Sequence, residues 1–312
     1  MRLGLIDYIN IFPVTYFLGE TLGPDWDVVY APPSRLNALL SEGGLDASPI
    51  SSVEYARHAS DYLLLPDLSV SSRGEVRSVV LYSRHRLEDL DGREITITGA
   101  TATSRVLLAI LLERFVGVRP QYRVGRTLPQ RPTATGRGSE RVWDVDPEDV
   151  GDGSVLLIGD DALAFRQAAL HDPALSGFAE YDLGLLWREF TGLPMVFAVW
   201  AVRGDVARRP EVKRLVEALH ASRARGESLP EVLLACAQKR VGLTHDELLD
   251  YYRCLYFTLD VEEEKGLLTF YRHATEMGLC PPCPALGFVP EDILPARGML
   301  DATTDRLLLH GH

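Results

Sequence analysis

The sequence contains few cysteines, few lysines and no long apolar run. Its 4 cysteines among 312 residues exclude a small disulfide-stapled scaffold. The longest apolar run, Leu193–Val202, is far shorter than the roughly 20 residues a membrane-spanning helix needs, so no transmembrane helix is expected. Asp7 interrupts the N-terminal apolar run before it could act as a signal peptide. We therefore predict a cytoplasmic protein with reduced thiols, and no membrane partner.

Positive charge is also scarce. The chain has 32 Lys+Arg against 44 Asp+Glu, a formal net charge of −12. Binding to nucleic acid needs clustered basic residues, so no nucleic-acid partner is expected. An anionic substrate would have to be held by local donors against the overall field. The apolar share of 46% is typical of globular proteins, and the length fits one large domain or two of average size.

Several catalytic motifs are missing. None of the lysines follows a glycine, which excludes a phosphate-binding Walker loop, and neither GxSxG nor HExxH occurs. Cys280-Pro-Pro-Cys283 is a lone CxxC without a second cysteine pair or a nearby histidine pair, and it is interpreted as a proline-rich loop. We expect neither a metal nor a cofactor. The Gly125–Gly153 stretch is interpreted as a surface loop or insertion.

Short apolar runs alternate with amphipathic segments, which predicts an α/β architecture with mostly parallel sheets. From Asp205 onward the pattern becomes helical. The predicted strands are Arg2–Ile6, Asp27–Ala31, Leu45–Ile50, Val76–Ser83, Glu94–Thr98, Val155–Gly159 and Met195–Val202. The predicted helices are Pro33–Leu40, Val53–His58, Arg105–Phe115, and, after Asp205, segments at Leu215–Leu219, Pro230–Lys239 and His245–Phe257.

Clusters of small polar residues follow four of these strands. Ligands of open α/β sheets bind at the carboxyl ends of the strands, where helix N–H groups can also hold a carboxylate. We therefore predict one shared anion pocket. Its candidate residues are Asn10; Ser51 and Ser52; Thr103 and Ser104; and Ile158, Gly159 and Asp160.

Each cluster can also be interpreted as a simple helix cap. Ser51 and Glu54 have the spacing of a capping box. Asp160 is expected to act as a cap, because its carboxylate would repel an anionic ligand. The polar stretch Ser69–Ser78 leads into a strand and is interpreted as a turn, although Ser78 or Arg77 could face the pocket, where Arg77 would offer a planar pair of donors.

Taken in order, the motifs resemble a known family, the chorismate dehydratases of the futalosine route to menaquinone. The resemblance spans most of residues 1–270 and is specific in combination, although each motif alone is weak. The segments that carry it are Tyr8–Pro13, Leu45–Ser52, Ser71–Val79, Thr103-Ser104, Ile158–Ala162, Tyr181–Gly184 and Thr191–Trp200.

The resemblance implies a two-lobed fold like that of the type II periplasmic binding proteins, with a cleft between the lobes and a helical C-terminal segment. Lobe one would be residues 1–78 and 200–312, and lobe two residues 79–199. The chain would cross between lobes along Val76–Ser83 and Met195–Val202.

The resemblance also implies that a small-molecule substrate, chorismate, is dehydrated to 3-[(1-carboxyvinyl)oxy]benzoate by a metal-free elimination, in a monomer or homodimer. Asn10 would be the catalytic residue. The substrate-binding residues would be Ser51, Ser52, Arg77, Ser78, Thr103, Ser104, Ile158, Gly159 and Asp160.

Two other functions compete with this prediction. The sibling enzyme 1,4-dihydroxy-6-naphthoate synthase shares the fold, and we would expect a histidine in its lobe-two binding motifs; residues 99–105 and 158–162 contain none. A solute-binding protein would normally carry a signal or lipid anchor, and a regulatory sensor a DNA-binding module; neither pattern is apparent. The prediction is therefore a dehydratase.

Overall fold

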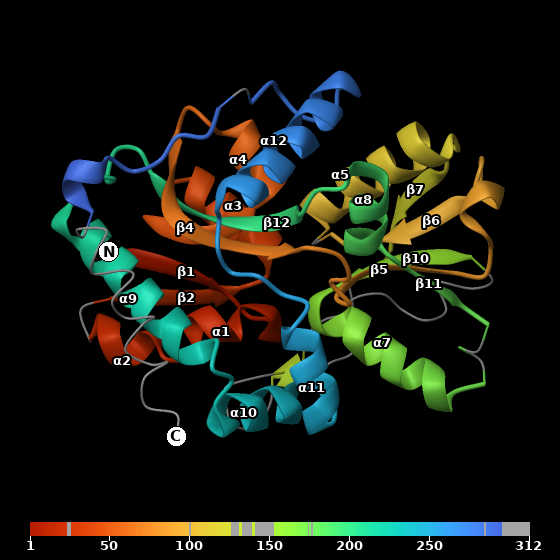
Figure 1. The fold of residues 1–312 in the computed structure, drawn as a ribbon, viewed down its shortest axis with the longest axis horizontal. Helices are drawn as coiled ribbons and strands as arrows, with labels where there is room; N and C mark the ends of the chain where they lie inside the picture. Colours follow the sequence, from red (N-terminus) through yellow and green to blue (C-terminus); the bar gives the residue numbers. More distant parts are fainter. Residues whose placement is uncertain are drawn as a thin grey trace.

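Two five-stranded sheets, each covered by helices, organise the computed structural model (Figure 1). The structure describes residues 1–23, 26–99, 101–125, 131–132, 139–140, 153–173, 175, 177–283 and 285–294. Most of the predicted Gly125–Gly153 loop lies outside these residues. No described helix combines the length and apolarity needed to cross a membrane.

The first sheet has the strand order β2-β1-β3-β12-β4. Its strands are β1 (Arg2–Ile6), β2 (Asp27–Ala31), β3 (Ala47–Ser51), β4 (Tyr62–Ser72) and β12 (Met195–Arg203). β1 pairs in parallel with β2 and β3, whereas β12 runs antiparallel to β3 and β4. Almost every residue of β12 is buried, because it lies inside the sheet between β3 and β4 and helices pack against it.

The helices of the first lobe have local sequence causes. Proline occupies the first turn of α3 and α9, where its missing N–H costs nothing. Thr244 and Glu247 form a reciprocal capping box that starts α11, and Asp260 caps α12. The elements are η1 (Ile9–Ile11), α1 (Phe12–Thr15), α2 (Leu18–Leu22), α3 (Pro33–Ser41), α4 (Ser52–Arg57), α9 (Pro210–Gly226), α10 (Glu231–Val241), α11 (His245–Tyr252), α12 (Val261–Glu276) and η4 (Glu291–Ile293).

The second sheet has the order β11-β5-β10-β6-β7, with β10, β6 and β7 parallel. Its strands are β5 (Val79–Ser83), β6 (Glu94–Ile97), β7 (Gln121–Val124), β10 (Ser154–Ile158) and β11 (Ala179–Asp182). The short ribbon of β8 (Arg131–Pro132) and β9 (Ser139–Glu140) stands apart. The helical segments are η2 (Leu87–Asp89), α5 (Ala102–Ala109), its π-helical continuation η3 (Ile110–Val116), α7 (Gly159–His171) and α8 (Leu183–Thr191).

The chain crosses between the sheets twice, at residues 73–78 and 192–194. The predicted crossing segments, Val76–Ser83 and Met195–Val202, are therefore wrong for most of their length: β5 pairs only within the second sheet and β12 only within the first. A strand buried on both faces needs partners along its whole length, which a crossing segment lacks. The division at residues 78, 79, 199 and 200 stays a prediction, and the pairing of β12 favours moving its second boundary to Met195.

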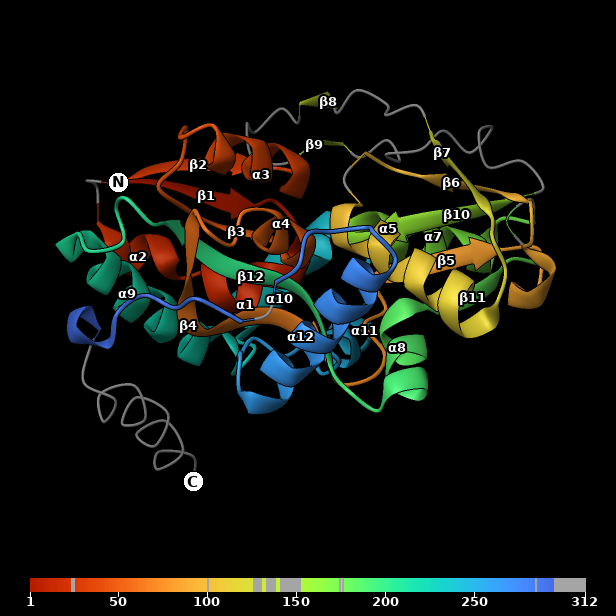
Figure 2. The ribbon, with the colours of Figure 1, turned by 90° about the horizontal axis from the view of Figure 1, so that it is seen from above.

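Helix α12 packs against both segments that cross between the lobes (Figure 2). Arg73, in the first crossing, makes a two-pronged ion pair with the fully buried Glu263 at 2.8 and 3.1 Å and a third bond to Asp260 at 2.9 Å. In the second crossing, the carbonyl oxygen of Pro194 packs so closely on Gly266 that a Cβ there would lie 2.2 Å away. The relative position of the two lobes thus depends on α12.

Two expectations about local structure fail for instructive reasons. The first part of the polar stretch Ser69–Ser78 is not a turn: Ser69–Ser72 pair with β12 as the end of β4, and the hydroxyls of Ser69 and Ser71 donate to backbone oxygens of Thr258 and Tyr256. Satisfied hydroxyls can be buried in a sheet. The capping box at Ser51 and Glu54 is also absent, since the Ser51 side chain makes no bond to the first turn of α4.

Candidate functional site at the strand ends

The carboxyl ends of two pairs of parallel strands carry the predicted site residues. β1 and β3 run in parallel in the first sheet, with Leu3 opposite Ala47, so the segments that follow them are neighbours. β6 and β10 do the same in the second sheet, with Ile97 opposite Leu156. The structure therefore brings Asn10 and the Ser51–Ser52 pair to one edge and the Thr103–Ser104 and Ile158–Asp160 clusters to another.

Asn10 lies in η1, directly after β1. The neighbouring residue is held firmly: Ile9 N donates to Asp160 Oδ1 at 3.0 Å, and Ile9 O accepts from the Tyr252 hydroxyl at 3.1 Å. The Asn10 side-chain oxygen, in contrast, is buried and has no hydrogen-bond partner among the described residues. Such an atom is costly unless a ligand or water supplies a donor.

A charge cluster around a buried carboxylate, here called the Asp160 joint, positions this segment. It consists of Asp7, Asp160 and Arg240. Arg240 Nε donates to Asp160 Oδ2 at 3.0 Å, and Arg240 Nη1 donates to Asp7 Oδ1 at 2.7 Å. Burial opposes the charge of Arg240, but the two carboxylates outweigh it and raise the pKa of Arg240 above its usual value. Asp160 is completely buried, and its negative charge is balanced by the Arg240 guanidinium.

The expectation that Asp160 caps its helix is wrong. Ile158 occupies the N-cap position of α7, and its apolar side chain makes no capping hydrogen bond. The Asp160 carboxylate turns away from its own helix toward Ile9 and Arg240. A buried carboxylate gains more from a guanidinium than from a cap position, because the guanidinium also neutralises its charge.

Gly159 is the contact point between the lobes beside this joint. Its φ is +59°, a conformation that favours glycine, and its N–H donates to Ser78 O at 2.7 Å. A Cβ at Gly159 would lie 2.9 to 3.1 Å from three ring carbons of Tyr8. Only glycine lets α7 start this close to the end of β1.

The serines after β3 have different roles. Ser51 Oγ accepts from Asn37 Nδ2 at 3.0 Å, which leaves its own O–H for another acceptor. Ser52 is fully buried: its Oγ donates to Val196 O at 2.7 Å, and its carbonyl accepts from Tyr271 OH at 2.7 Å. The Ser52 hydroxyl therefore anchors α4 to β12, and Ser51 is the serine with a free donor.

The threonine–serine pair of the second lobe meets α4. Thr103 Oγ1 accepts a hydrogen bond from Val53 N at 3.1 Å, across the two lobes. Ser104 beside it is buried. The N–H groups at the start of α4 were predicted to hold a carboxylate. One of them, that of Val53, is instead bonded to Thr103 in this arrangement.

Arg77 and Ser78 lie in the first crossing. Arg77 Nε donates to Glu75 Oε2 at 3.1 Å, so its guanidinium already has a carboxylate partner. Ser78 is almost completely buried, and its hydroxyl donates to Val76 O at 3.3 Å. The structure places Ser78 against the site through its carbonyl, which receives Gly159 N.

Three important residues were not predicted as site residues. Asp7 and Arg240 belong to the Asp160 joint, and Asp182 accepts hydrogen bonds from Val76 N and Arg77 N while capping α8. Burial raises the pKa of Asp182, and the bonds from Leu185, Arg77 and Val76 N–H groups oppose that rise. An Asp before a helix start signals a cap, but Arg240 carries no local signal at all.

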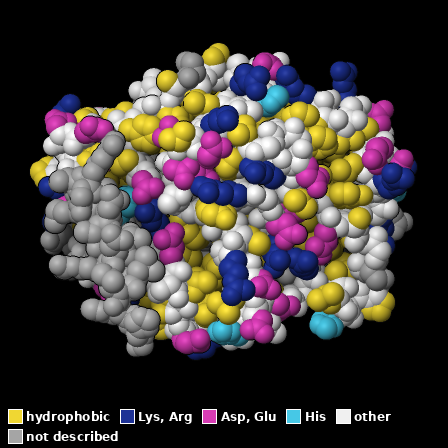
Figure 3. Space-filling view, in the orientation of Figure 1, with side chains coloured by type: hydrophobic (Ala, Val, Ile, Leu, Met, Phe, Trp, Pro, Cys, Tyr) yellow, Lys and Arg dark blue, Asp and Glu magenta, His cyan; other side chains and the backbone are white. Residues whose placement is uncertain are grey.

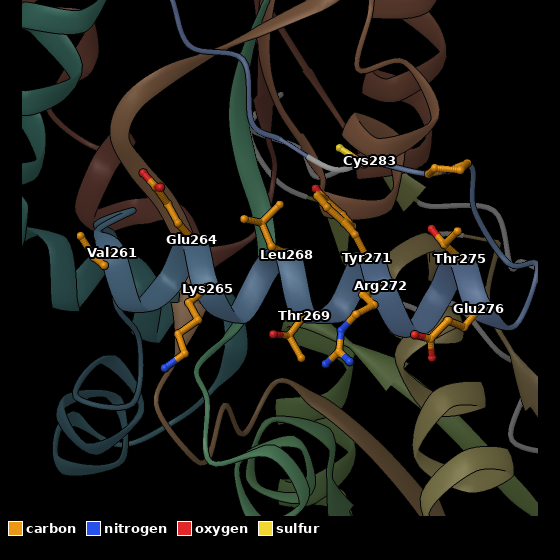
Figure 4. Close-up of a pocket in the computed structure, with 11 residues that line it drawn as sticks. Val261, Glu264, Lys265, Leu268, Thr269, Tyr271, Arg272, Thr275, Glu276 and Cys283 are labelled. Atoms are coloured by element: carbon orange, nitrogen blue, oxygen red, sulfur yellow. The ribbon is translucent and has the colours of Figure 1, made fainter.

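Other surface features do not coincide with this site. A groove of about 640 Å³ runs along α12, and none of the predicted site residues lines it. Figure 4 shows its polar side chains from α12, with Arg272 beside Glu276 and Lys265 nearer the start of the helix. Basic and acidic side chains are interspersed on the face shown in Figure 3. Among the described residues, no group of three or more His, Cys, Asp or Glu side chains could hold a metal ion.

Comparison with protein families gives a match to the model described as menaquinone biosynthesis, over residues 1–276. A chorismate dehydratase of Thermus thermophilus is 33% identical over 278 residues, covering 86% of this chain and 93% of that protein. A 1,4-dihydroxy-6-naphthoate synthase of the same organism is 27% identical over 259 residues, covering 81% and 85%.

Solved structures show the fold. A protein of Archaeoglobus fulgidus superposes with a TM-score of 0.68 at 18% identity, covering 89% of this chain and 97% of that chain. A Candida albicans protein, described as having the generic periplasmic binding protein fold, gives a TM-score of 0.56 at 11% identity, covering 93% and 98%. The predicted periplasmic-binding-protein-like α/β fold is confirmed, but the expectation of mostly parallel sheets is wrong, because β12 and β5 run antiparallel to their neighbours and make both sheets mixed.

Proposed function

Because the chain belongs to the menaquinone biosynthesis family, we propose that it dehydrates chorismate to 3-[(1-carboxyvinyl)oxy]benzoate. The relative of 33% identity that carries the name chorismate dehydratase supports this choice within the family. The observation that carries it in the structure is the buried, partnerless side-chain oxygen of Asn10 at the end of β1. That oxygen is an acceptor, and the hydroxyl that chorismate loses is a donor.

The reaction needs one proton acceptor and one leaving hydroxyl. The C3 proton of chorismate is acidic because the C1 carboxylate accepts charge through the C1=C2 double bond. Removing this proton leaves an electron pair that forms the C3=C4 bond as the C4–O bond breaks. The departing hydroxyl takes up a proton and leaves as water, and the ring becomes aromatic.

The protein side chains around the strand ends supply hydrogen bonds rather than a base. The oxygens of Asp160 are engaged by Ile9 N and Arg240, which leaves this carboxylate poorly placed to take a proton. We assign the proton transfer to the substrate's own enolpyruvyl carboxylate, which accepts the C3 proton and returns it to the departing hydroxyl. This cycle leaves no net proton on the protein.

The remaining groups hold the substrate for this transfer. The free O–H of Ser51 and the hydroxyls of Thr103 and Ser104 are neutral donors suited to the two carboxylates and to the charge that develops on the C1 side. Asn10 accepts from the C4 hydroxyl and fixes its direction. Gly159 and Ser78 bring the second lobe against this end of the site.

The first test is turnover. Purified protein is mixed with chorismate, EDTA and no added cofactor, and the products are followed by mass spectrometry. We expect a product lighter by one water with the absorption spectrum of a benzoate. Chorismate that binds tightly but stays unchanged would instead identify a solute-binding or sensor protein. Neither binding nor turnover would move the proposal to the naphthoate synthase reaction, whose substrate would be tried next.

The second test is Asn10→Ala. Since the Asn10 side-chain oxygen has no partner in the free protein, we expect the melting temperature to stay unchanged while kcat falls by about a hundredfold. Wild-type turnover in this variant would contradict the assigned role.

The proposal also includes a cytoplasmic location and a monomeric or homodimeric state. Gel filtration of the purified protein would measure the oligomeric state.

A further inference from the structure

A second cavity lies on another face of α5. It has a volume of about 500 Å³, within the usual range for small-molecule sites. It is lined by Ala102, Arg105, Val106 and Ala109, which share one face of the helix, whereas Thr103 and Ser104 do not line it. Thr98, Gly99 and Thr101, which follow β6, also line it, so the cavity lies beside the strand-end site but shares none of the predicted site residues.

Two arginines without carboxylate partners line this cavity. Arg57 comes from the last turn of α4 in the first lobe, and Arg105 comes from α5 in the second. Neither makes an ion pair with any residue that the structure describes, in contrast to Arg77, Arg73 and Arg240. In a chain with a net charge of −12, two such arginines at one cavity mark a place that attracts an anion.

A buried hydroxyl adds a third polar group. The Tyr122 hydroxyl, from β7, is shielded from solvent and has no hydrogen-bond partner among the described residues. The Arg105 guanidinium carbon lies 5.9 Å from the centre of the Tyr122 ring. Glu113 is the acidic side chain on the described wall of the cavity, so the positive charges outnumber it there.

The rest of the wall combines two threonines, Thr98 and Thr101, with apolar side chains. Ile97, Val106, Ala109 and Leu279 contribute methyl and methylene groups beside the polar ones. Inorganic phosphate would use the arginines but leave this surface unfilled. A planar ring that carries one carboxylate would contact both the arginines and the apolar side chains.

We propose that this cavity binds a small aromatic carboxylate, with Arg57 and Arg105 on its carboxylate and Val106 and Leu279 against its ring. Arg57 and Leu279 belong to the first lobe and Arg105 and Val106 to the second, so the ligand connects the two lobes. It binds best when the lobes are closed, and it stabilises that arrangement. The inference does not depend on the proposed reaction.

Benzoate is the probe for the test, used with the full-length protein in isothermal titration calorimetry. We expect one saturable site in the wild type and at least tenfold weaker binding in each of Arg57→Ala and Arg105→Ala. The matched control is Arg35→Ala, because Arg35 is also exposed, lacks a partner among the described residues, and lies outside the described lining of the cavity. Binding in that variant should be unchanged.

Two further measurements separate this site from the strand-end site. Asn10→Ala should bind benzoate as the wild type does, and inorganic phosphate should bind the wild type at least tenfold more weakly than benzoate. Benzoate binding that is lost in Asn10→Ala but kept in Arg57→Ala, or no saturable benzoate binding at all, would overturn the proposal. Equal binding of phosphate and benzoate would overturn its aromatic part.

Discussion

At the end of β1 the two lobes meet through buried charges, whereas at the end of β3 they meet through neutral hydroxyls. The first junction is the Asp160 joint, with Ile9 N and Arg240 on a completely buried carboxylate. The second is the single bond from Val53 N to Thr103 Oγ1, with Ser51 and Ser104 beside it.

This difference has a physical consequence. Breaking a buried ion cluster leaves an uncompensated charge and is expensive, whereas a neutral hydrogen bond can be exchanged for one to a ligand at little net cost. We infer that the β1 junction stays intact and positions Asn10. At the β3 junction, we infer that the hydrogen bond between the lobes breaks when the substrate binds and is replaced by hydrogen bonds to the substrate. A rigid side and an adaptable side then face one another across the site.

Removing Asp160 should have the largest effect. Asp160→Ala leaves Arg240 buried with Asp7 alone and frees Ile9 N, so we expect a loss of about 3–5 kcal/mol in the free energy of unfolding. Urea unfolding measures this change. The control is Asp250→Ala, which breaks an exposed pair with Arg253 on α11 and should cost no more than about 0.5 kcal/mol. Similar costs for the two variants would show that the Asp160 joint contributes no more to stability than an exposed ion pair.

Filling the contact at Gly159 should have an intermediate effect. Gly159→Ala adds strain at a φ of +59° and pushes a Cβ into Tyr8, so we expect about 2–4 kcal/mol of destabilisation and a raised KM. Gly192→Ala is the matched control, since Gly192 has a φ of +72° but open space around its Cβ position. If both variants lose the same stability and keep the same KM, the Tyr8 contact does not position the site.

Changing the neutral junction should have the smallest effect on stability. Thr103→Val removes the acceptor for Val53 N, and we expect a loss of about 1 kcal/mol in the free energy of unfolding. Activity should fall about tenfold, because the same hydroxyl serves the substrate, and Thr103→Ser should restore it. A Thr103→Val variant as destabilised as Asp160→Ala would show that this side is not adaptable.

The elements with strong local patterns were predictable. β1 and β2 agree residue for residue with the predicted strands, and α3 starts at the predicted Pro33. All of β4 (Tyr62–Ser72) was missed, and its last residues were interpreted as a turn, because a run of serines is typical of a turn unless other backbone groups satisfy the hydroxyls. The predicted helix Arg105–Phe115 begins earlier, at Ala102, and ends as a π-helix.

The candidate site was predictable in part, since polar residues after strands mark the carboxyl edge of a sheet wherever the strands later pair. That reasoning locates Asn10, Ser51 and Thr103 but cannot assign their bonds. Ser51 and Ser52 are adjacent and chemically identical, yet one has a free donor and the other anchors a helix. The difference comes from Asn37 and Val196, which are 14 and 144 residues away.

The sequence by itself determined the α/β class, the strand ends that carry polar residues, and the family, because these depend on periodicity and on short motifs. Only the tertiary structure decided that Asp160 holds Arg240 instead of capping its helix, and that Arg57 and Arg105 share a cavity. The partners of these charges lie far away along the chain. A buried charge takes its role from what surrounds it in space, and no local pattern records that environment.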